Sequence, residues 1–446
     1  MIIISTRYND VKKILGNQDF IVSTLYRPIL YHKAVFVNDG VLVYNLITRE
    51  LVLMSIGEYS NYNNGIATEY LVNHWFMVPH DLDDSTLLYI YNKSFDERFK
   101  INEYGKFNLC TIITTTDCNA RCPYCYEKGI QKKHMTEKVA LDVAKYILER
   151  CQDGVRLNWF GGEPLYNYKI INLICDYFIE NNVNFSSSMI SNGYLFDQIP
   201  IDIIKNRWNL KTVQITLDGT KEIYNKTKDY IYKNVNAFDK IIKNIGFLLS
   251  NEIFINIRLN ISNDNINNLY KLCDFLALHF SGNPYINVYC KVLFDAPTFH
   301  LSSNERHNLF LKQLDLSEYI RSKKLCRKFS IPPIKRCHCM ANDGRSAVFN
   351  TDGNLSLCEH YITDGFYGSI YSNEYDRDIL RKFKERSEPI EECKTCFYRP
   401  QCIKLKACDP EKICDNDNRM EINWQVTTMM KDVYDKYKRN LNTKCN

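Results

Sequence analysis

The 446-residue sequence lacks any run of about 18 apolar residues, the length that a helix needs to cross a bilayer. Residues 1–10 lack the charged segment, apolar stretch and cleavage site of a secretory signal. These absences predict a cytoplasmic protein without a membrane partner. The formal net charge of +5 is small for this length. We therefore expect no nucleic-acid partner either.

Cysteine is absent from the first 109 residues, although the chain contains 18 cysteines. Their overall density is below that of a disulfide scaffold, and a reducing compartment disfavours structural disulfides. Metal binding, catalysis and simple burial remain as explanations for the cysteines. Their distribution along the chain decides among these explanations.

The cysteine-free N-terminal part has the pattern of a small α+β module. Three apolar runs are typical of strands: 34–37, 41–44 and 51–54. Asn38-Asp39-Gly40 favours a hairpin turn between the first two runs. A helical stretch from about residue 58 to residue 75 follows. We predict a three-stranded sheet with helices, forming a separate module over residues 1–105.

Strand and helix patterns alternate from residue 107 to about residue 291. The strand candidates are 109–115, 156–160, 187–191, 212–217, 253–260 and 286–292. Helical patterns at 137–151 and 168–181 lie between them. This alternation predicts an α/β fold with a mostly parallel sheet, either an open or a closed barrel. Functional groups are expected at the carboxyl ends of the strands.

The C-terminal part has a different pattern. A polar connection over residues 301–336 follows the core, which we assign to residues 106–300. Residues 337–414 contain eight cysteines and little regular periodicity. A terminal helix is predicted from about residue 420 to residue 442. We treat residues 337–446 as one loop-rich C-terminal domain.

Three cysteines follow the first core strand directly. Cys118, Cys122 and Cys125 have the spacing Cys-x3-Cys-x2-Cys. Three thiolates can hold three irons of a [4Fe–4S] cube and leave the fourth iron open. A four-thiolate zinc site would be closed and structural. A zinc knuckle that lacks one ligand, or three unrelated thiols, are the alternatives.

This spacing, with Tyr124 before the third cysteine, resembles the signature of the radical S-adenosylmethionine (SAM) superfamily. The resemblance implies a partial (β/α)6 TIM-like barrel and a [4Fe–4S] cluster on Cys118, Cys122 and Cys125. It further implies that the open iron binds the amino and carboxylate groups of SAM. An electron then cleaves SAM to methionine and a 5′-deoxyadenosyl radical. Tyr124 becomes a candidate contact of the cofactor.

Further segments resemble the SAM-binding motifs of that superfamily. The tetrapeptide Gly161-Gly162-Glu163-Pro164 ends the second core strand, where glycines let the backbone approach a ligand and Glu163 could neutralise an ammonium group. Ser191-Asn192-Gly193 and 214–219 resemble its next two motifs. The resemblance implies SAM contacts by these residues: Gly161, Gly162, Glu163, Asn192 and Thr216. Arg258 is a candidate partner of the SAM carboxylate, although pairing with a structural carboxylate fits it equally.

The C-terminal cysteines form a second pattern. Their spacing in isolation also fits structural zinc, but the arrangement resembles a SPASM domain, which carries two auxiliary [4Fe–4S] clusters. By resemblance, the inner cluster takes Cys339, Cys358 and Cys408, with Cys337 as a candidate fourth ligand. The outer cluster takes Cys393, Cys396, Cys402 and Cys414.

Two features depart from the SPASM pattern. The gap between Cys402 and Cys408 holds five residues instead of the usual three. Cys337 and Cys339 are separated by one residue, and two such close thiolates do not comfortably reach one cube. The inner cluster would then have an open iron that could bind a substrate thiolate.

The whole arrangement resembles radical SAM maturases of ribosomally made peptides, such as sactipeptide and ranthipeptide thioether synthases. The resemblance implies a precursor peptide with a leader sequence as substrate, and a flavodoxin or ferredoxin as electron donor. It implies a thioether cross-link, with carbon–carbon cross-linking or epimerisation as variants. The N-terminal module would be winged-helix-like and would bind the leader by adding a strand to its sheet. A generic cap on the barrel is the alternative for this module.

Anaerobic sulfatase-maturating enzymes, which form formylglycine, are the main alternative. They place an aspartate after the cysteine that matches Cys358, whereas this chain has Glu359. A carboxylate there could act as a catalytic base, so Glu359 is a candidate catalytic residue. A non-catalytic iron–sulfur or zinc scaffold is disfavoured by the Gly161–Pro164 motif. A nucleic-acid-modifying enzyme is disfavoured by the small net charge.

Overall fold

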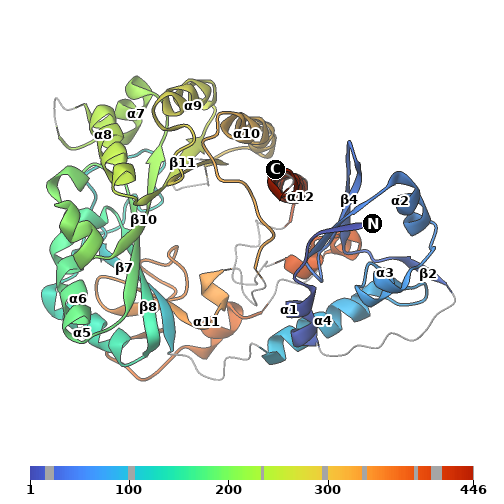
Figure 1. Cartoon of the computed structure of the whole chain (residues 1–446). Coiled ribbons are helices and arrows are strands. Elements are labelled where there is room, and N and C mark those ends of the chain that lie inside the picture. The colour runs from blue at the N-terminus through green and yellow to red at the C-terminus, as the bar shows by residue number, and fades with distance from the viewer. Residues whose placement is uncertain are drawn as a thin grey trace. The chain divides into compact units, whose positions relative to one another are not determined.

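The computed structural model describes residues 1–15, 25–98, 106–232, 236–293, 300–333, 339–385, 390–402 and 414–444. The chain divides into two compact units (Figure 1). The first unit comprises Met1–Asn102, Lys328–Cys339 and Lys382–Asn446. The second comprises Glu103–Arg327 and Met340–Arg381. The first unit therefore joins the beginning of the chain to its end. The motif-based division at residues 105, 300 and 336 stays a prediction.

The second unit is built on parallel strands that follow one another in both sequence and space. The strands are β7 (Phe107–Thr115), β8 (Cys151–Gly161), β9 (Phe185–Ser191), β10 (Leu210–Leu217), β11 (Phe254–Ile261) and β12 (Ile286–Val292). The helices are α5 (Glu137–Leu148), α6 (Tyr168–Glu180), α7 (Lys221–Lys228), α8 (Ala237–Ser250), α9 (Ile266–Phe280) and α10 (Ser303–Ser322). In Figure 1, α5, α6, α8 and α9 lie outside the arc of strands. The six strands expected from the sequence are confirmed.

The two sides of these strands differ in chemistry because successive residues of a strand point in opposite directions. In β10, Val213, Ile215 and Leu217 are fully buried. Gln214 and Thr216 alternate with them and line a cavity. The apolar side thus forms core, while the polar side remains available for a ligand.

The barrel is open in the described part of the chain, where β7 and β12 are not neighbours. Instead β7 pairs in parallel with β13 (Ser346–Phe349). Two antiparallel strands, β14 (Asn354–Ser356) and β15 (Gly368–Ser369), extend the sheet further. The sequence showed little regularity here, because strands this short carry almost no periodic signal. The short helix α11 (Arg377–Lys382) ends this part of the unit.

The first unit contains an antiparallel sheet with the order β1-β5-β4-β3. Its strands are β1 (Ile2–Ser5), β3 (His32–Val37), β4 (Gly40–Asn45) and β5 (Glu50–Met54), and β2 (Tyr26–Pro28) pairs with β6 (Met77–Pro79). Its N-terminal helices are α1 (Tyr8–Leu15), α2 (Ile56–Asn63), α3 (Glu69–Asn73) and α4 (Asp84–Arg98). The three expected strands are confirmed, and β1 adds a fourth. The single expected helix is two helices, because Gly65 adopts φ +79° between them.

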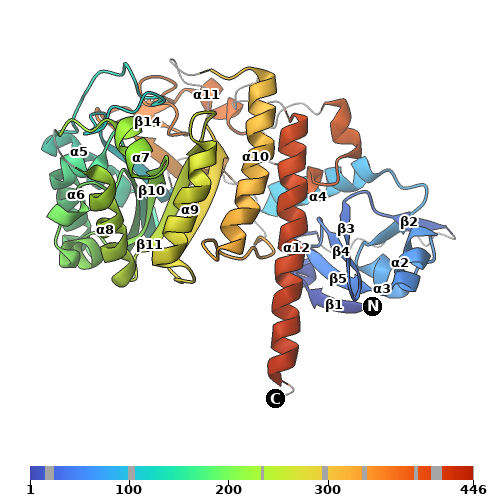
Figure 2. The same cartoon turned by 90° about the horizontal axis from the view of Figure 1, so that it is seen from above.

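Both faces of this sheet are covered. Val41 and Val43 of β4 pack with residues of α2 and α3. Leu42 and Tyr44 point to the other face and pack with α12 (Asn416–Lys444). Figure 2 shows α12 as a long helix of this unit, and it contacts β1 and β3. The C-terminal helix therefore completes the hydrophobic core of the N-terminal sheet.

The helix α12 extends the predicted terminal helix by a few residues at each end. Its buried side chains include Val426, Met429 and Met430, and charged residues are frequent along the rest of its length. None of the helices in the described ranges has both the length and the apolar character that crossing a membrane requires.

We predict that Met430→Ala destabilises the first unit selectively. The Met430 side chain is fully buried between α12 and the N-terminal sheet, and truncating such a side chain costs about 2–5 kcal/mol. Hydrogen exchange of the β4 and β5 amides should accelerate accordingly. Lys436→Ala, an exposed position of the same helix, is the matched control. Unchanged protection of β4 and β5 in Met430→Ala would contradict this packing role.

Candidate active site

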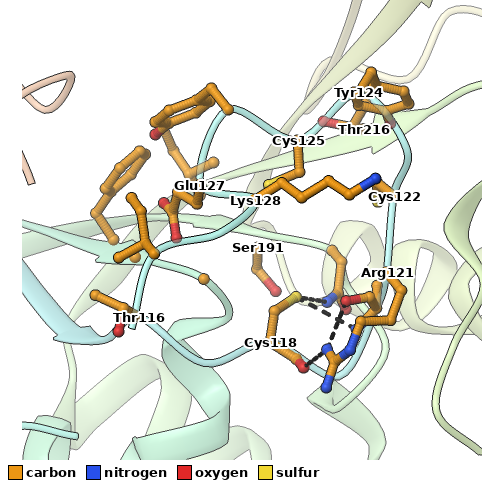
Figure 3. Close-up of a pocket in the computed structure, with 18 of the residues that line it drawn as sticks. Thr116, Cys118, Arg121, Cys122, Tyr124, Cys125, Glu127, Lys128, Ser191 and Thr216 are labelled. Atoms are coloured by element: carbon orange, nitrogen blue, oxygen red, sulfur yellow. Dashed lines mark hydrogen bonds between the residues drawn. The ribbon is translucent and has the colours of Figure 1, made fainter. Parts of the chain in front are cut away.

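Three cysteines lie in the loop that follows the carboxyl end of β7. Cys118, Cys122 and Cys125 all line one cavity of about 580 Å³ (Figure 3). A cavity of this size is typical of a small-molecule site. The structure therefore brings together the three thiols whose spacing suggested a cluster.

Most of the other predicted SAM contacts line the same cavity. They come from the loop and from the ends of neighbouring strands: Tyr124, Gly161, Gly162, Asn192, Thr216 and Arg258. Glu359, the candidate base, also lines it. Thr216 and Arg258 lie opposite each other in the register of β10 and β11. Glu163 does not line the cavity, because its side chain is fully buried.

The two glycines at the end of β8 allow a close approach between backbones. A Cβ atom on Gly161 would overlap the carbonyl oxygen of Thr115, and one on Gly162 would overlap that of Asp117. The Gly162 amide donates to the Thr115 carbonyl (3.0 Å), and the Glu163 amide donates to the Asp117 carbonyl (3.0 Å). We expected these glycines to make room for a ligand. The structure shows that they also hold the first residues of the cysteine loop against β8.

The Glu163 carboxylate binds the turn that follows β9. It accepts hydrogen bonds from the Ser191 hydroxyl (2.8 Å), the Asn192 amide (2.7 Å) and the Leu165 amide (3.2 Å). Burial raises the pKa of Glu163 to about 7, against the lowering effect of these hydrogen bonds. The residue thus fixes the Asn192 turn relative to the cysteine loop. Its direct contact with a SAM ammonium stays a prediction.

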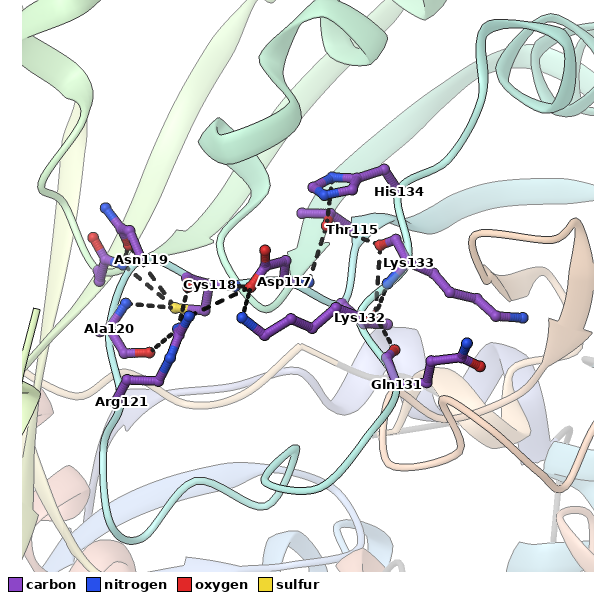
Figure 4. A network of polar contacts seen from close by, with 12 residues as sticks. Thr115, Asp117, Cys118, Asn119, Ala120, Arg121, Gln131, Lys132, Lys133 and His134 are labelled. Atoms are coloured by element: carbon purple, nitrogen blue, oxygen red, sulfur yellow. Dashed lines mark hydrogen bonds and ion pairs between the residues drawn. The ribbon is translucent and has the colours of Figure 1, made fainter. Parts of the chain in front are cut away.

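The cysteine loop is also held from two other sides. The Arg121 amide donates to the Lys228 carbonyl (2.9 Å), and the Ile231 amide donates to the Asn119 carbonyl (2.9 Å). On the returning side, Lys132 forms an ion pair with Asp117 (2.9 Å; Figure 4). These contacts place the loop over the carboxyl ends of the strands.

The sulfur of Cys118 has hydrogen-bond donors in place. The Ala120 amide (3.4 Å) and the Asn192 side-chain amide (3.8 Å) both donate to its Sγ. Burial raises the pKa of the Cys118 thiol to about 12, so metal binding would be needed to deprotonate it near neutral pH. Donors aimed at a sulfur suit a metal-bound thiolate. These features fit the [4Fe–4S] cluster implied by the cysteine spacing.

Within the described ranges, no three His, Cys, Asp or Glu side chains converge on a point where one metal ion would bind. A [4Fe–4S] cube takes each thiolate on a different iron, so its ligands surround the cluster and do not converge on one atom.

A buried polar network beside the cysteines was missed by the sequence analysis. The Tyr124 hydroxyl donates to Asp218 Oδ2 (2.6 Å), and Lys228 Nζ donates to the Tyr124 hydroxyl (2.9 Å). Lys228 and Asp218 form an ion pair (3.1 Å) with side chains 6% and 1% exposed. Burial is the largest single effect and disfavours the charge on Lys228, but Asp218 acting together with Cys122, Tyr124 and Tyr224 outweighs it and raises the pKa of Lys228 well above its usual value. No spacing rule links these residues, because the contacts form only in the tertiary fold.

Arg258 donates from Nε to Asn260 Oδ1 (2.9 Å). Asn260 in turn donates to Asp218 Oδ1 (3.2 Å). Arg258 is thereby oriented by the same buried network that holds Tyr124. Its predicted bond to the SAM carboxylate stays a prediction.

Another part of the cavity wall is acidic and aromatic. Tyr126 and His360 have ring centroids 5.2 Å apart, and Glu127 and Glu359 line the cavity with them. Burial raises the pKa of Glu127 to about 7, and it also raises the pKa of Glu359. Glu127 Oε2 is buried and has no hydrogen-bond partner among the described residues. Tyr126 and Glu127 carry no spacing signal in the sequence, so only the structure identifies them as part of this wall.

The predicted auxiliary-cluster ligands are placed only in part. Cys393, Cys396 and Cys402 lie together in two short turns of the first unit. Burial raises the pKa of Cys396, and the neighbouring Cys402 and Cys393 raise it further. Cys414 is also in the first unit, as is Cys339, whereas Cys358 is in the second. Cys337 and Cys408 lie outside the described residues. Both auxiliary ligand sets stay predictions.

We predict that Asp218→Asn destabilises the second unit by about 3–5 kcal/mol, because it leaves the buried Lys228 ammonium without a counter-charge. Urea denaturation measures this loss. Asp239→Asn is the matched control, since Asp239 pairs with Lys221 at the surface, with both side chains about half exposed. The control should change stability by about 0–1 kcal/mol. Equal losses in the two variants would refute the importance of the buried pair.

Comparison with known proteins connects this site to a superfamily. Residues 112–276 match the family model described as the radical SAM superfamily. The cysteine-type anaerobic sulfatase-maturating enzyme of Clostridium novyi is 24% identical over 327 residues, which cover 65% of this chain and 84% of that enzyme.

Two solved structures share the fold over most of the chain. Native anSMEcpe with bound AdoMet and Cp18Cys peptide has a TM-score of 0.55 and 16% identity, covering 75% of this chain and 99% of that one. Streptococcus suis SuiB bound to precursor peptide SuiA has a TM-score of 0.52 and 13% identity, covering 88% and 99%. The predicted α/β fold is thereby confirmed. Residues 112–276 are a radical SAM domain, and the chain is an enzyme with the radical SAM fold.

Proposed function

We propose that this enzyme cleaves SAM and uses the resulting radical to modify a ribosomally made precursor peptide. The observation that carries the proposal is the gathering of Cys118, Cys122 and Cys125 around one cavity at the carboxyl ends of the parallel strands. When bound there, a [4Fe–4S] cluster and SAM supply a 5′-deoxyadenosyl radical that abstracts hydrogen from a substrate carbon. The protein residues bind, orient and shield these groups.

The residues around the cavity have separable tasks in this proposal. The three cysteines hold the cluster, and the backbone pairing of Gly162 and Glu163 with the loop keeps them in place. Asn192, Thr216 and Arg258 line the cavity from three successive strands or their loops, where they would hold SAM. The Asp218–Lys228 pair orients Tyr124 from behind. Side chains that the protein already holds in position reduce the reorganisation that the reaction requires.

Two observations favour a peptide as the substrate. The structure of SuiB bound to its precursor peptide matches 88% of this chain. The structure of anSMEcpe with bound AdoMet and a peptide matches 75% of it. The first unit offers an antiparallel sheet with two edge strands, β1 and β3. Edge strands accept extended peptides by strand addition, so we propose that this sheet binds the leader of the precursor.

For the bond, we propose a thioether formed between a cysteine sulfur and a carbon of the same peptide. Glu359 would act as the base that removes the thiol proton, since burial raises the pKa of this carboxyl and strengthens it as a base. The radical would take one hydrogen atom from the carbon, and the electron left when the sulfur–carbon bond forms would pass to the proposed inner auxiliary cluster. Formation of formylglycine is the second candidate, because the sulfatase-maturating enzyme matches 65% of the chain. Carbon–carbon cross-linking and epimerisation are variants of the first candidate.

The two auxiliary clusters are part of the same proposal. The outer one would take Cys393, Cys396, Cys402 and Cys414, and the inner one Cys339, Cys358 and Cys408, with Cys337 as a fourth ligand. A flavodoxin or ferredoxin would supply the electrons. Cys393, Cys396 and Cys402 share one neighbourhood in the first unit, which supports the outer set.

We predict that Cys118→Ala, Cys122→Ala and Cys125→Ala each abolish formation of 5′-deoxyadenosine by the anaerobically reconstituted, dithionite-reduced protein. Each variant removes one ligand of the proposed cluster. Cys273→Ala is the control, because Cys273 is buried in α9 and has no proposed ligand role. Cleavage at the control rate in any of the three variants would sink the proposed function.

A mass-spectrometric assay on a cysteine-containing precursor peptide encoded beside this protein distinguishes the candidate reactions. A thioether removes two hydrogens, keeps the sulfur and leaves that cysteine resistant to thiol alkylation. Formylglycine replaces sulfur by oxygen and removes two hydrogens, a carbon–carbon cross-link leaves the thiol alkylatable, and epimerisation leaves the mass unchanged. We expect the thioether pattern. SAM cleavage with every peptide thiol still alkylatable would exclude it.

A further inference from the structure

The turn between β4 and β5 is buried throughout, which is unusual because turns normally lie at the surface. Asn45, Leu46, Ile47, Thr48 and Glu50 are fully buried and Arg49 is 1% exposed. Segments from later in the chain cover this turn within the first unit. Arg49 Nη1 reaches the carbonyls of Pro332 and Pro333, and Gln401 Nε2 donates to the Leu46 carbonyl (2.9 Å).

Arg49 is a buried cation whose charge is not matched in the described part of the chain. Its only bonds there are the two long ones to Pro332 and Pro333, at 3.3 and 3.4 Å. Among the described residues, its Nε atom is buried without a partner, as is the hydroxyl of the adjacent Thr48. The neighbouring carboxylate of Glu50 is occupied by Tyr70 and His74. An unpaired buried guanidinium is costly, so the site calls for an anion.

Cys402, one of the ligands proposed for the outer cluster, lies beside the turn that carries Arg49. Gln401, which binds the buried turn, directly precedes Cys402. The same Gln401 side chain also donates to the Tyr44 hydroxyl of β4 (3.4 Å). Phe397 and Tyr398 pack against the hydrophobic core of the N-terminal sheet. The cysteine segment is therefore folded onto the module that carries Arg49.

We propose that Arg49 is the counter-cation of an iron–sulfur cluster held by Cys393, Cys396, Cys402 and Cys414. This inference rests on the outer cluster of the proposed function. Four thiolates give a [4Fe–4S] cluster a net negative charge, which increases when the cluster is reduced. A buried cation nearby stabilises the reduced form more than the oxidised form and raises the reduction potential. The sheet proposed to bind the leader thus also sets the potential of the outer cluster.

The first test measures the reduction potential of the outer cluster by EPR-monitored titration. The titration uses a Cys118→Ala/Cys122→Ala/Cys125→Ala variant, which lacks the SAM-site cluster. The EPR signal that disappears when Cys402→Ala is added to this variant belongs to the outer cluster. Arg49→Gln should lower the reduced-to-oxidised ratio at a fixed potential about tenfold, equivalent to about 59 mV. Arg49→Lys keeps the charge and should stay close to the parent. Arg7→Gln, at a partly exposed arginine paired with Asp10 in the same unit, should leave the potential unchanged.

The second test compares thermal unfolding of the cluster-free and cluster-loaded proteins. Without the cluster, Arg49→Gln removes an unmatched buried charge and should raise the melting temperature of the first unit. With the cluster, the same change removes a counter-ion and should lower it. A substitution that destabilises both forms equally would assign Arg49 a purely structural role and overturn the proposal.

The outcomes separate this inference from the function on which it rests. Absence of iron that depends on Cys402 would refute the outer cluster itself. A Cys402-dependent cluster whose potential is the same in the parent, Arg49→Gln and Arg49→Lys would refute the role of Arg49 and leave the cluster intact. Equal shifts in Arg49→Gln and Arg49→Lys would also refute it, because only one of them removes the charge.

Discussion

The short backbone pairing between the end of β8 and the start of the cysteine loop is the contact on which the candidate active site depends. The Gly162 and Glu163 amides bond to the Thr115 and Asp117 carbonyls, and this is possible only because positions 161 and 162 lack a Cβ atom. Cys118 follows immediately. Backbone geometry therefore positions the first thiol, and the Lys132–Asp117 ion pair adds to it.

The interior of the domain is polar around this pairing, and the buried carboxylates of Asp218 and Glu163 are hydrogen-bonded. Asp218 forms an ion pair with Lys228 and accepts hydrogen bonds from Tyr124 and Asn260. Glu163 accepts hydrogen bonds from three donors. Buried networks that are fully bonded stiffen a site, so the groups that face the cavity are held from behind. Glu127 is an exception in the described cavity wall, since one of its oxygens lacks a partner.

The first unit shows a dependence between the two ends of the chain. The N-terminal sheet buries Leu42 and Tyr44 against α12, and its β4–β5 turn is covered by Gln401 and by the segment that contains Pro332. A sheet with both faces covered cannot be removed without exposing apolar surface. The proposed peptide-binding module and the proposed outer cluster are consequently parts of one folded body.

The sequence by itself determined what depends on local spacing. Alternating apolar residues located all six core strands, and the Cys118, Cys122 and Cys125 spacing identified the loop that lines the cavity. Only the tertiary structure decided what depends on contacts between distant residues. The Asp218–Lys228 pair with Tyr124, the bonds of Glu163 to the Asn192 turn, and the closure of the N-terminal core by α12 are of this kind. Periodicity reports which face of an element is apolar, but it does not report which partner covers that face.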